Sequence, residues 1–287
     1  PAGVSIMPML LNSPFGVAAG PDGRIYVADT GNKRMVILNN LGEQLREVNA
    51  ADTPLDEPFD VATDSTGQVY LLDAALGRVA LFNADGDYLG NLPTPQDVPE
   101  RSRGLFVDLE RRVWLAHTAG SRVYAVDQQG NPVMMANMIG EEGAQPIDVA
   151  VGIGGNIYAT DGDRHKLMFF SAQGERTFSL ELAPANTLAG PHLAVDSLGF
   201  VYVTDPEAGR VLRFAPDGQQ VGYYDLRGAG VVRPVGVAVD PVGKIWVTDI
   251  ERGQVAVVTP PETPAMPVLQ PQVTPREEVP VEAAPIA

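Results

Sequence analysis

The sequence predicts an all-β protein, a six-bladed β-propeller of four-stranded antiparallel blades. A unit of 44 residues recurs six times along the chain of 287 residues. One position of every unit is aromatic: Tyr26, Tyr70, Trp114, Tyr158, Tyr202 and Trp246. A basic residue keeps the same interval in five units: Arg34, Arg78, Arg122, Lys166 and Arg210. A shared period in two unrelated residue types indicates a repeated structural unit.

The first unit contains the four strands of one blade. Short apolar runs at 17–20, 25–28 and 35–38 are separated by Pro-Asp-Gly and Asp-Thr-Gly-Asn, whose residues favour tight turns. A fourth run, 45–48, follows Asn-Leu-Gly. A single meander of four strands leaves a face uncovered, so six copies predict a closed ring in which neighbouring sheets cover each other.

The last unit lacks its own fourth strand. Thr259-Pro260-Pro261-Glu262 stands where the other units have a glycine turn, and proline cannot donate a hydrogen bond to a sheet. The N-terminal run 4–11 aligns with the fourth strand of the first unit. We therefore predict that the N-terminal strand completes the sixth blade and closes the ring.

Two regions follow from this pattern, a propeller over 1–259 and an acidic, Pro-rich tail over 260–287. The tail contains eight prolines and no amphipathic period, which favours an extended chain that serves as a linker or docks on a partner. No stretch approaches the ~20 apolar residues that a transmembrane helix needs. The sequence therefore predicts no transmembrane segment.

The formal charge of −16 and the absence of cysteine exclude several functions. A field of this sign repels phosphate backbones, so we expect no nucleic-acid partner. Without cysteine the chain has no disulfides, thiolate metal sites or cysteine nucleophiles.

Candidate site residues occupy the position just before the first predicted strand of each unit, at the expected mouth of the central channel. This column reads Gly16, Asp60, Gly104, Asp148, His192 and Gly236. Asp60, Asp148 and His192 are candidate ligand-binding residues, and together they could hold a divalent cation, Ca²⁺ or Zn²⁺. In the alternative interpretation the aspartates accept main-chain N–H bonds where the strand begins.

A second acidic column recurs in five units, which indicates architecture rather than chemistry. It consists of Asp29, Asp73, Asp161, Asp205 and Asp249. We predict that each caps the turn between the second and third strands and that the basic residue five positions later pairs with it, as Arg34 with Asp29.

The units resemble the NHL repeat. The segment PFGVAAGPDGRIYVADTGNKR, from Pro14 to Arg34, matches its pattern almost completely, and degenerate copies begin at Pro58 and Pro234. The resemblance covers 14–259 and implies a six-bladed propeller. The family includes protein-binding scaffolds, RNA-binding domains, extracellular sensor domains and a few lyases. GPHLAVD, from Gly190, is similar to the zinc-carrying segments of the amidating lyase with this fold, which uses several such histidines, whereas this chain offers His192.

Two classes of function remain, and the sequence favours the first. One is a non-catalytic scaffold that binds a protein partner, a larger assembly or another ligand such as a glycan or peptide, and is tethered through the tail. Its recognition loops would join the second and third strands, at 30–33, 74–77, 118–121, 162–165, 206–209 and 250–253. The other is a metal-dependent lyase or lactonase at the channel mouth. The resemblance and the Pro-rich tail imply a location outside the cytoplasm of a bacterium.

Overall fold

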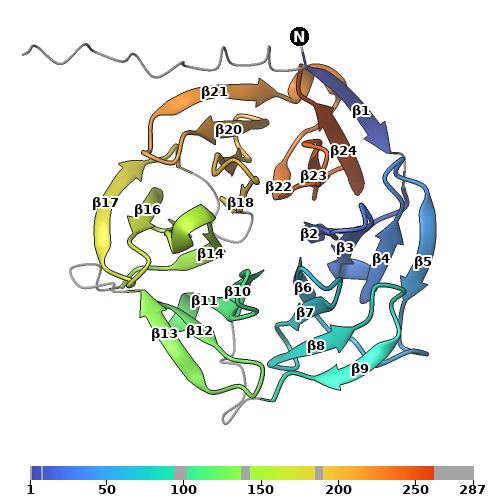
Figure 1. Ribbon diagram of the computed structural model, residues 1–287. Helices are drawn as coiled ribbons and strands as arrows, with labels where there is room; N and C mark the ends of the chain where they lie inside the picture. The colour runs from blue at the N-terminus through green and yellow to red at the C-terminus, as the bar shows by residue number, and fades with distance from the viewer. Residues whose placement is uncertain (1, 8, 94–101, 137–142, 185–189, 262–287) are drawn as a thin grey trace, which may run out of the picture.

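The computed structural model forms six four-stranded antiparallel sheets, arranged as blades around a central channel (Figure 1). It describes residues 2–7, 9–93, 102–136, 143–184 and 190–261. All but the first two residues of the predicted tail lie outside this part of the chain. The six-bladed propeller predicted from the period is confirmed.

In the first five blades the strands follow one another from the channel outward. Blade one consists of β2 (Pro14–Ala19), β3 (Ile25–Asp29), β4 (Arg34–Leu38) and β5 (Gln44–Val48). Blade two consists of β6 (Pro58–Thr63), β7 (Val69–Asp73), β8 (Arg78–Phe82) and β9 (Tyr88–Asn91). Blade three consists of β10 (Ser102–Val107), β11 (Val113–His117), β12 (Arg122–Val126) and β13 (Pro132–Ala136).

The next two blades have the same order. Blade four consists of β14 (Pro146–Val151), β15 (Ile157–Asp161), β16 (Lys166–Phe170) and β17 (Arg176–Glu181). Blade five consists of β18 (Leu193–Val195), β19 (Val201–Asp205), β20 (Arg210–Phe214) and β21 (Gln220–Asp225).

Blade six takes its outer strand from the N-terminus, as predicted. It consists of β22 (Pro234–Val239), β23 (Ile245–Asp249), β24 (Gln254–Thr259) and β1 (Gly3–Met7). β1 pairs antiparallel with β24, in a register that runs from Gly3–Thr259 to Met7–Val255. Val4 and Ile6 pack against the apolar cluster of this blade, so the two ends of the propeller are joined in one sheet.

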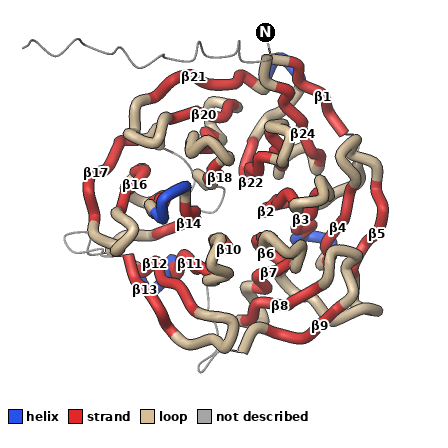
Figure 2. Tube along the Cα trace, in the orientation of Figure 1, coloured by secondary structure: helices blue, strands red, loops and turns tan. Residues whose placement is uncertain are grey.

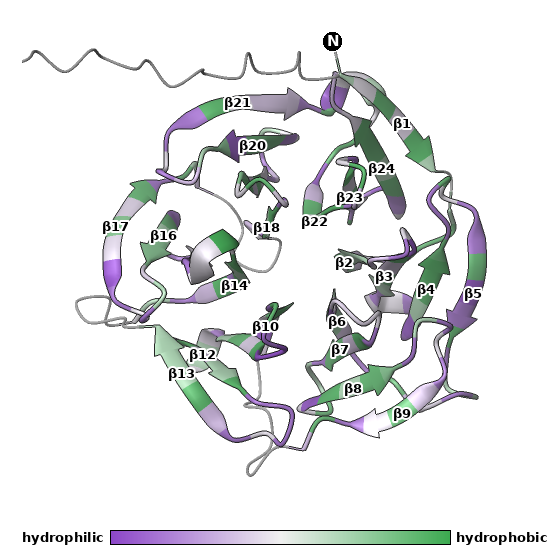
Figure 3. Ribbon diagram, viewed as in Figure 1, coloured by the Kyte–Doolittle hydropathy of each residue, from purple (hydrophilic) through white to green (hydrophobic). Residues whose placement is uncertain are grey.

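The hydrophobic core lies between adjacent blades. Tyr26 of blade one, for example, belongs to a buried cluster with Val61 and Leu71 of blade two. All six aromatic residues of the repeating column are at most 3% exposed, and Trp114 Nε1 donates to Asp108 at 2.8 Å. In Figure 3 the third strands β4, β8 and β24 are coloured hydrophobic, whereas much of the outer strand β5 is hydrophilic. Each sheet therefore buries both faces of its middle strands against its neighbours.

The strand directions give the propeller two distinct faces. Figure 2 shows the strands of the blades and the loops and turns that join them. Pro14 at the start of β2 pairs with Asp29 at the end of β3, so the loops before the first strand and between the second and third strands share one face, the loop face. The turns between first and second strands and between third and fourth strands form the turn face. In the described residues no helix is long and apolar enough to cross a membrane.

The second acidic column caps the loops, as predicted. Asp29 accepts the main-chain N–H of Asn12 at 2.7 Å and Nε of Arg34 at 2.7 Å. Asp249 accepts the N–H groups of Val232 and Arg233 at 2.9 and 3.1 Å. Asp161 and Asp205 accept N–H groups of the turn that follows the second strand, from Arg164 at 3.0 Å and from Ala208 at 3.3 Å. The column thus caps these turns, and in blades one, two and six it also holds the entering segment.

Candidate functional site

The first candidate column lies deeper in the propeller than predicted. Asp60 and Asp148 are the third residues of β6 and β14, beside a β-bulge, and only His192 directly precedes its strand. The prediction placed strand one too late because the bulge interrupts the alternation of side chains after Pro58. All three side chains are buried, at 6%, 5% and 2% exposure in that order.

Each of the two aspartates links its blade to the next one. Asp60 Oδ1 accepts the N–H of Val61 at 2.8 Å, and Oδ2 accepts that of Leu105 in blade three at 2.7 Å. Asp148 repeats this arrangement with Val149 at 2.8 Å and Leu193 in blade five at 2.9 Å. The alternative interpretation, that these carboxylates accept main-chain N–H bonds, is confirmed.

Glycine alternates with aspartate in this column because neighbouring blades meet closely. A Cβ atom on Gly104 would lie 2.5 Å from Cα of Asp148 and 2.7 Å from the carbonyl oxygen of Ile147. A Cβ atom on Gly16 would collide with Asp60 in the same way. Only glycine leaves room for the aspartate of the following blade.

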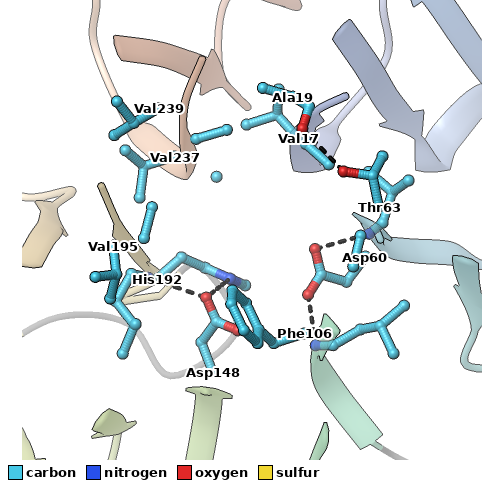
Figure 4. Close-up of a pocket in the computed structure, with 18 of the residues that line it drawn as sticks. Val17, Ala19, Asp60, Thr63, Phe106, Asp148, His192, Val195, Val237 and Val239 are labelled. Carbon is cyan, nitrogen blue, oxygen red and sulfur yellow. Dashed lines mark hydrogen bonds and ion pairs between the residues drawn. The ribbon is translucent and has the colours of Figure 1, made fainter. Parts of the chain in front are cut away.

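His192 contributes the third polar side chain. Its Nδ1 lies 3.3 Å from Asp148 Oδ2, which assigns the Nδ1 proton to this contact. Its Nε2 is buried and has no hydrogen-bond partner among the described residues. Figure 4 shows Asp60, Asp148 and His192 around one cavity, so the structure brings the three predicted residues together.

The electrostatic environment of Asp60 is unfavourable for charge. Burial raises the pKa of the Asp60 carboxyl well above its usual range, and the nearby Asp148 raises it further. The N–H bonds from Leu105 and Val61 oppose this rise without cancelling it. The cavity thus disfavours the ionised form of the Asp60 carboxyl.

The cavity is the central channel, with a volume of about 190 Å³, and it is closed toward the loop face. The Phe59 ring stacks on Phe15 at 4.4 Å between centroids and lies 6.5 Å from the imidazole of His192 in the opposite blade. The Arg103 guanidinium lies 4.8 Å from the Phe59 ring centroid. Phe59 is 1% exposed and precedes Asp60 on β6, so the three candidate residues lie at the loop-face end of the channel, which we call the closed end.

The opposite end opens on the turn face. A hollow of about 620 Å³ shares Ala19, Thr63, Val107, Val195 and Val239 with the channel cavity and is lined further by the turns between first and second strands. The channel is therefore continuous with the turn face.

Four exposed apolar residues surround this opening. They are Leu109, Ile153, Leu198 and Val242, which are 60–80% exposed and lie on the turns of blades three to six. We call this set the apolar rim. The periodicity did not predict it, although one signal existed: the matching turns of blades one and two carry Pro21-Asp22 and Ser65-Thr66 instead.

The residues at the closed end do not fit a divalent cation. Among the described residues no three His, Asp or Glu side chains are grouped so as to hold a metal ion. All four carboxylate oxygens of Asp60 and Asp148 already accept main-chain N–H bonds, whereas Ca²⁺ requires six to eight oxygen ligands. The predicted Ca²⁺ or Zn²⁺ site is therefore not supported by this donor set.

Comparison with known proteins identifies the fold. The NHL repeat family model matches residues 11–38. A gluconolactonase from Xanthomonas campestris is 15% identical with a TM-score of 0.70, covering 91% of this chain and 90% of its own. An inactive virginiamycin B lyase from Staphylococcus aureus, solved with quinupristin, is 12% identical with a TM-score of 0.66. The match covers 91% of this chain and 100% of that one.

A chain of a nidogen/laminin complex has the same fold. It is 15% identical with a TM-score of 0.63, and the match covers 78% of this chain and 84% of that one. No curated protein matches the sequence. At these identities the structural neighbours establish the propeller fold alone.

Proposed function

We propose that this chain, a six-bladed propeller of the NHL type, is a non-catalytic scaffold that docks a protein partner on its turn face. The observation that carries this proposal is the apolar rim around the open end of the channel. Leu109, Leu198 and Val242 are each more than 70% exposed on turns that border a common hollow. Contiguous exposed apolar surface around a cavity is typical of interaction sites.

The charge of the protein indicates the chemistry of the partner. The net charge is −16. Three carboxylates on the turn face stay largely exposed although each pairs with an arginine: Asp85 is 70% exposed, Glu110 67% and Asp87 60%. A partner segment with apolar side chains flanked by lysine or arginine complements this surface.

The loop face supports docking less well in the described residues. Its loops are fastened by the capping aspartates, and Lys33 in the first of them pairs with Asp56. Recognition by the loop at 30–33 and by the equivalent loops of the other blades stays a prediction from the sequence. The location outside the cytoplasm stays a prediction as well.

A lyase or lactonase at the channel receives less support. Such an enzyme was expected to use a cation on Asp60, Asp148 and His192, and their carboxylate oxygens are occupied by main-chain donors. The structural neighbours include both enzymes and a protein complex, so they favour neither class.

The proposal is tested by selecting peptides from a random displayed library on the full chain. Selected peptides should combine apolar residues with flanking Lys or Arg, and their affinity should fall at least tenfold in Leu198→Asp and in Val242→Asp. Lys33→Ser, on the loop face, serves as the matched surface control and should bind unchanged. Binding that survives both rim substitutions but disappears in Lys33→Ser overturns the proposal. So does rim-dependent sedimentation with phosphatidylcholine vesicles in place of peptide binding.

A further inference from the structure

We propose that the closed end of the channel is a binding site for a primary ammonium group carried on an aliphatic stem. The site is separate from the apolar rim and goes beyond the proposed function. Its ligand chemistry is shared by a free alkylamine and by a lysine side chain of a partner, and the experiment below distinguishes these sources.

The polar atoms that remain for a ligand at this end are acceptors. Asp60 and Asp148 take up the N–H groups of Val61, Leu105, Val149 and Leu193, which removes these donors from the channel wall. Asp60 Oδ1, Asp60 Oδ2 and Asp148 Oδ1 each keep a further lone pair after one such bond, whereas Asp148 Oδ2 also faces His192 Nδ1 at 3.3 Å. A ligand that supplies donors therefore fits better than one that supplies acceptors.

His192 provides an independent indication of a ligand. Its side chain is 2% exposed, lines the channel cavity, and carries an Nε2 atom without a hydrogen-bond partner in the described part of the chain. With the ring proton on Nδ1 and directed to Asp148, Nε2 is the acceptor nitrogen of the ring. A buried polar atom left without a partner is unfavourable, so this position favours an incoming donor.

A primary ammonium supplies hydrogen-bond donors and a positive charge to a cavity end whose free polar atoms are acceptors. It carries three N–H donors and one positive charge, and Asp60, Asp148 and His192 present acceptors around one cavity (Figure 4). A cation placed here also favours the ionised form of Asp60, whose pKa burial and Asp148 raise. A divalent cation would need more oxygen ligands than the site leaves free.

The channel walls suit an aliphatic stem. Val17, Val107, Val195, Val237 and Val239 line the cavity of about 190 Å³. From Thr63 at the open end to Asp60 the strand advances three residues, roughly 10 Å. Methylene groups of a lysine-like stem are commonly buried along such walls while the charged head reaches a polar environment.

The experiment titrates n-pentylammonium into the full chain by calorimetry and uses n-pentanol as the neutral match. We expect the ammonium to bind at least tenfold more tightly than the alcohol, and His192→Phe to weaken it at least tenfold. Leu198→Asp on the apolar rim should leave the affinity for n-pentylammonium unchanged. Because the rim is tested by peptide binding and the channel by n-pentylammonium, one proposal can fail without the other. Equal affinity for n-pentanol, or no binding of n-pentylammonium at millimolar concentration, overturns the proposal.

A second readout needs no substitution in the channel. The chain contains three histidines, so the ¹⁵N signal of His192 Nε2 can be resolved and should shift on adding n-pentylammonium. An unchanged signal contradicts the site even if His192→Phe fails to fold. Two peptides that differ only by lysine or norleucine identify the source: lysine-dependent binding indicates a partner's side chain, and binding of n-pentylammonium alone indicates a free amine.

Discussion

The rings of Phe59 and His192 lie 6.5 Å apart although they belong to opposite blades of the propeller. Phe59 thus spans the centre of the ring of blades and separates the loop face from the layer of Asp60, Asp148 and His192. This layer is reached from the turn face, where the apolar rim lies.

Replacing Phe59 by alanine should destabilise the protein by about 3–5 kcal/mol, because the side chain is 1% exposed and its removal leaves a cavity between opposite blades. Urea unfolding measures this change. Leu10→Ala, at a position that is 93% exposed, is the control and should stay within about 0.5 kcal/mol of wild type. Equal effects of the two substitutions would show that Phe59 does not close the channel.

Gly104→Ala should be destabilising by roughly 1–3 kcal/mol, because its Cβ would press on the backbone of Ile147 and Asp148 in the next blade. Gly222→Ala is the matched control, since a Cβ there meets nothing within 4 Å. Thermal unfolding compares the two variants. A melting temperature for Gly104→Ala as high as that of Gly222→Ala would refute the close approach of blades three and four.

The N-terminal closure predicts different effects at adjacent residues of β1. Ile6→Asp should destabilise the propeller by about 2 kcal/mol, because Ile6 packs into the cluster of blade six. Ser5→Asp points outward and should change stability by less than about 0.5 kcal/mol. Chemical denaturation of both variants measures the difference, and tolerance of Ile6→Asp would argue against closure by β1.

Asp60 predicts a pH dependence of stability. Its pKa is raised in the folded protein by burial and by Asp148, so the folded state binds the proton more tightly than the unfolded chain does. The stability that the Asp60 carboxyl contributes is fully present below its pKa in the unfolded chain, about 3.9. It is lost as the pH rises through its pKa in the folded protein. Wild type should therefore lose stability relative to Asp60→Asn as the pH increases.

Asp127 is the control for this titration, because its pKa is shifted in the opposite direction. Hydrogen bonds from Asn131 hold the pKa of Asp127 below its usual value, so its contribution is present at higher pH and is lost as the pH falls through the folded value. Denaturation curves of wild type, Asp60→Asn and Asp127→Asn at a series of pH values give the pH dependence of the stability difference for each carboxyl. A wild type that gains stability over Asp60→Asn with rising pH would contradict the burial of this carboxyl.

Much of the fold could be predicted because equivalent positions of successive units share a structural role, such as that of a buried aromatic residue or a capping aspartate. The aromatic column from Tyr26 to Trp246 is buried in every blade, and the missing glycine turn after Thr259 correctly indicated the N-terminal strand. The capping role of Asp29 with Arg34 also followed from spacing alone. These features depend on local pairing and on the period, both of which are visible in one sequence.

The candidate site could be predicted only in part because its character depends on contacts between blades. The period placed Asp60, Asp148 and His192 on one axis, but it could not show that Leu105 and Leu193 occupy the carboxylates. It also could not show that Phe59 reaches across the channel, since the period does not reveal how far a side chain extends: the same position carries Phe15 in the first unit and Arg103 in the third. The apolar rim was missed because an apolar residue in a turn has no periodic partner to distinguish it.

The most direct test of recognition by the turn face is hydrogen–deuterium exchange of the full chain with and without a selected peptide. We predict protection in the turns at 108–111, 152–155, 196–199 and 240–243, with the loops at 30–33, 74–77 and 118–121 unchanged. Protection of those loops without protection of the turns would contradict docking on the apolar rim and would return recognition to the loop face.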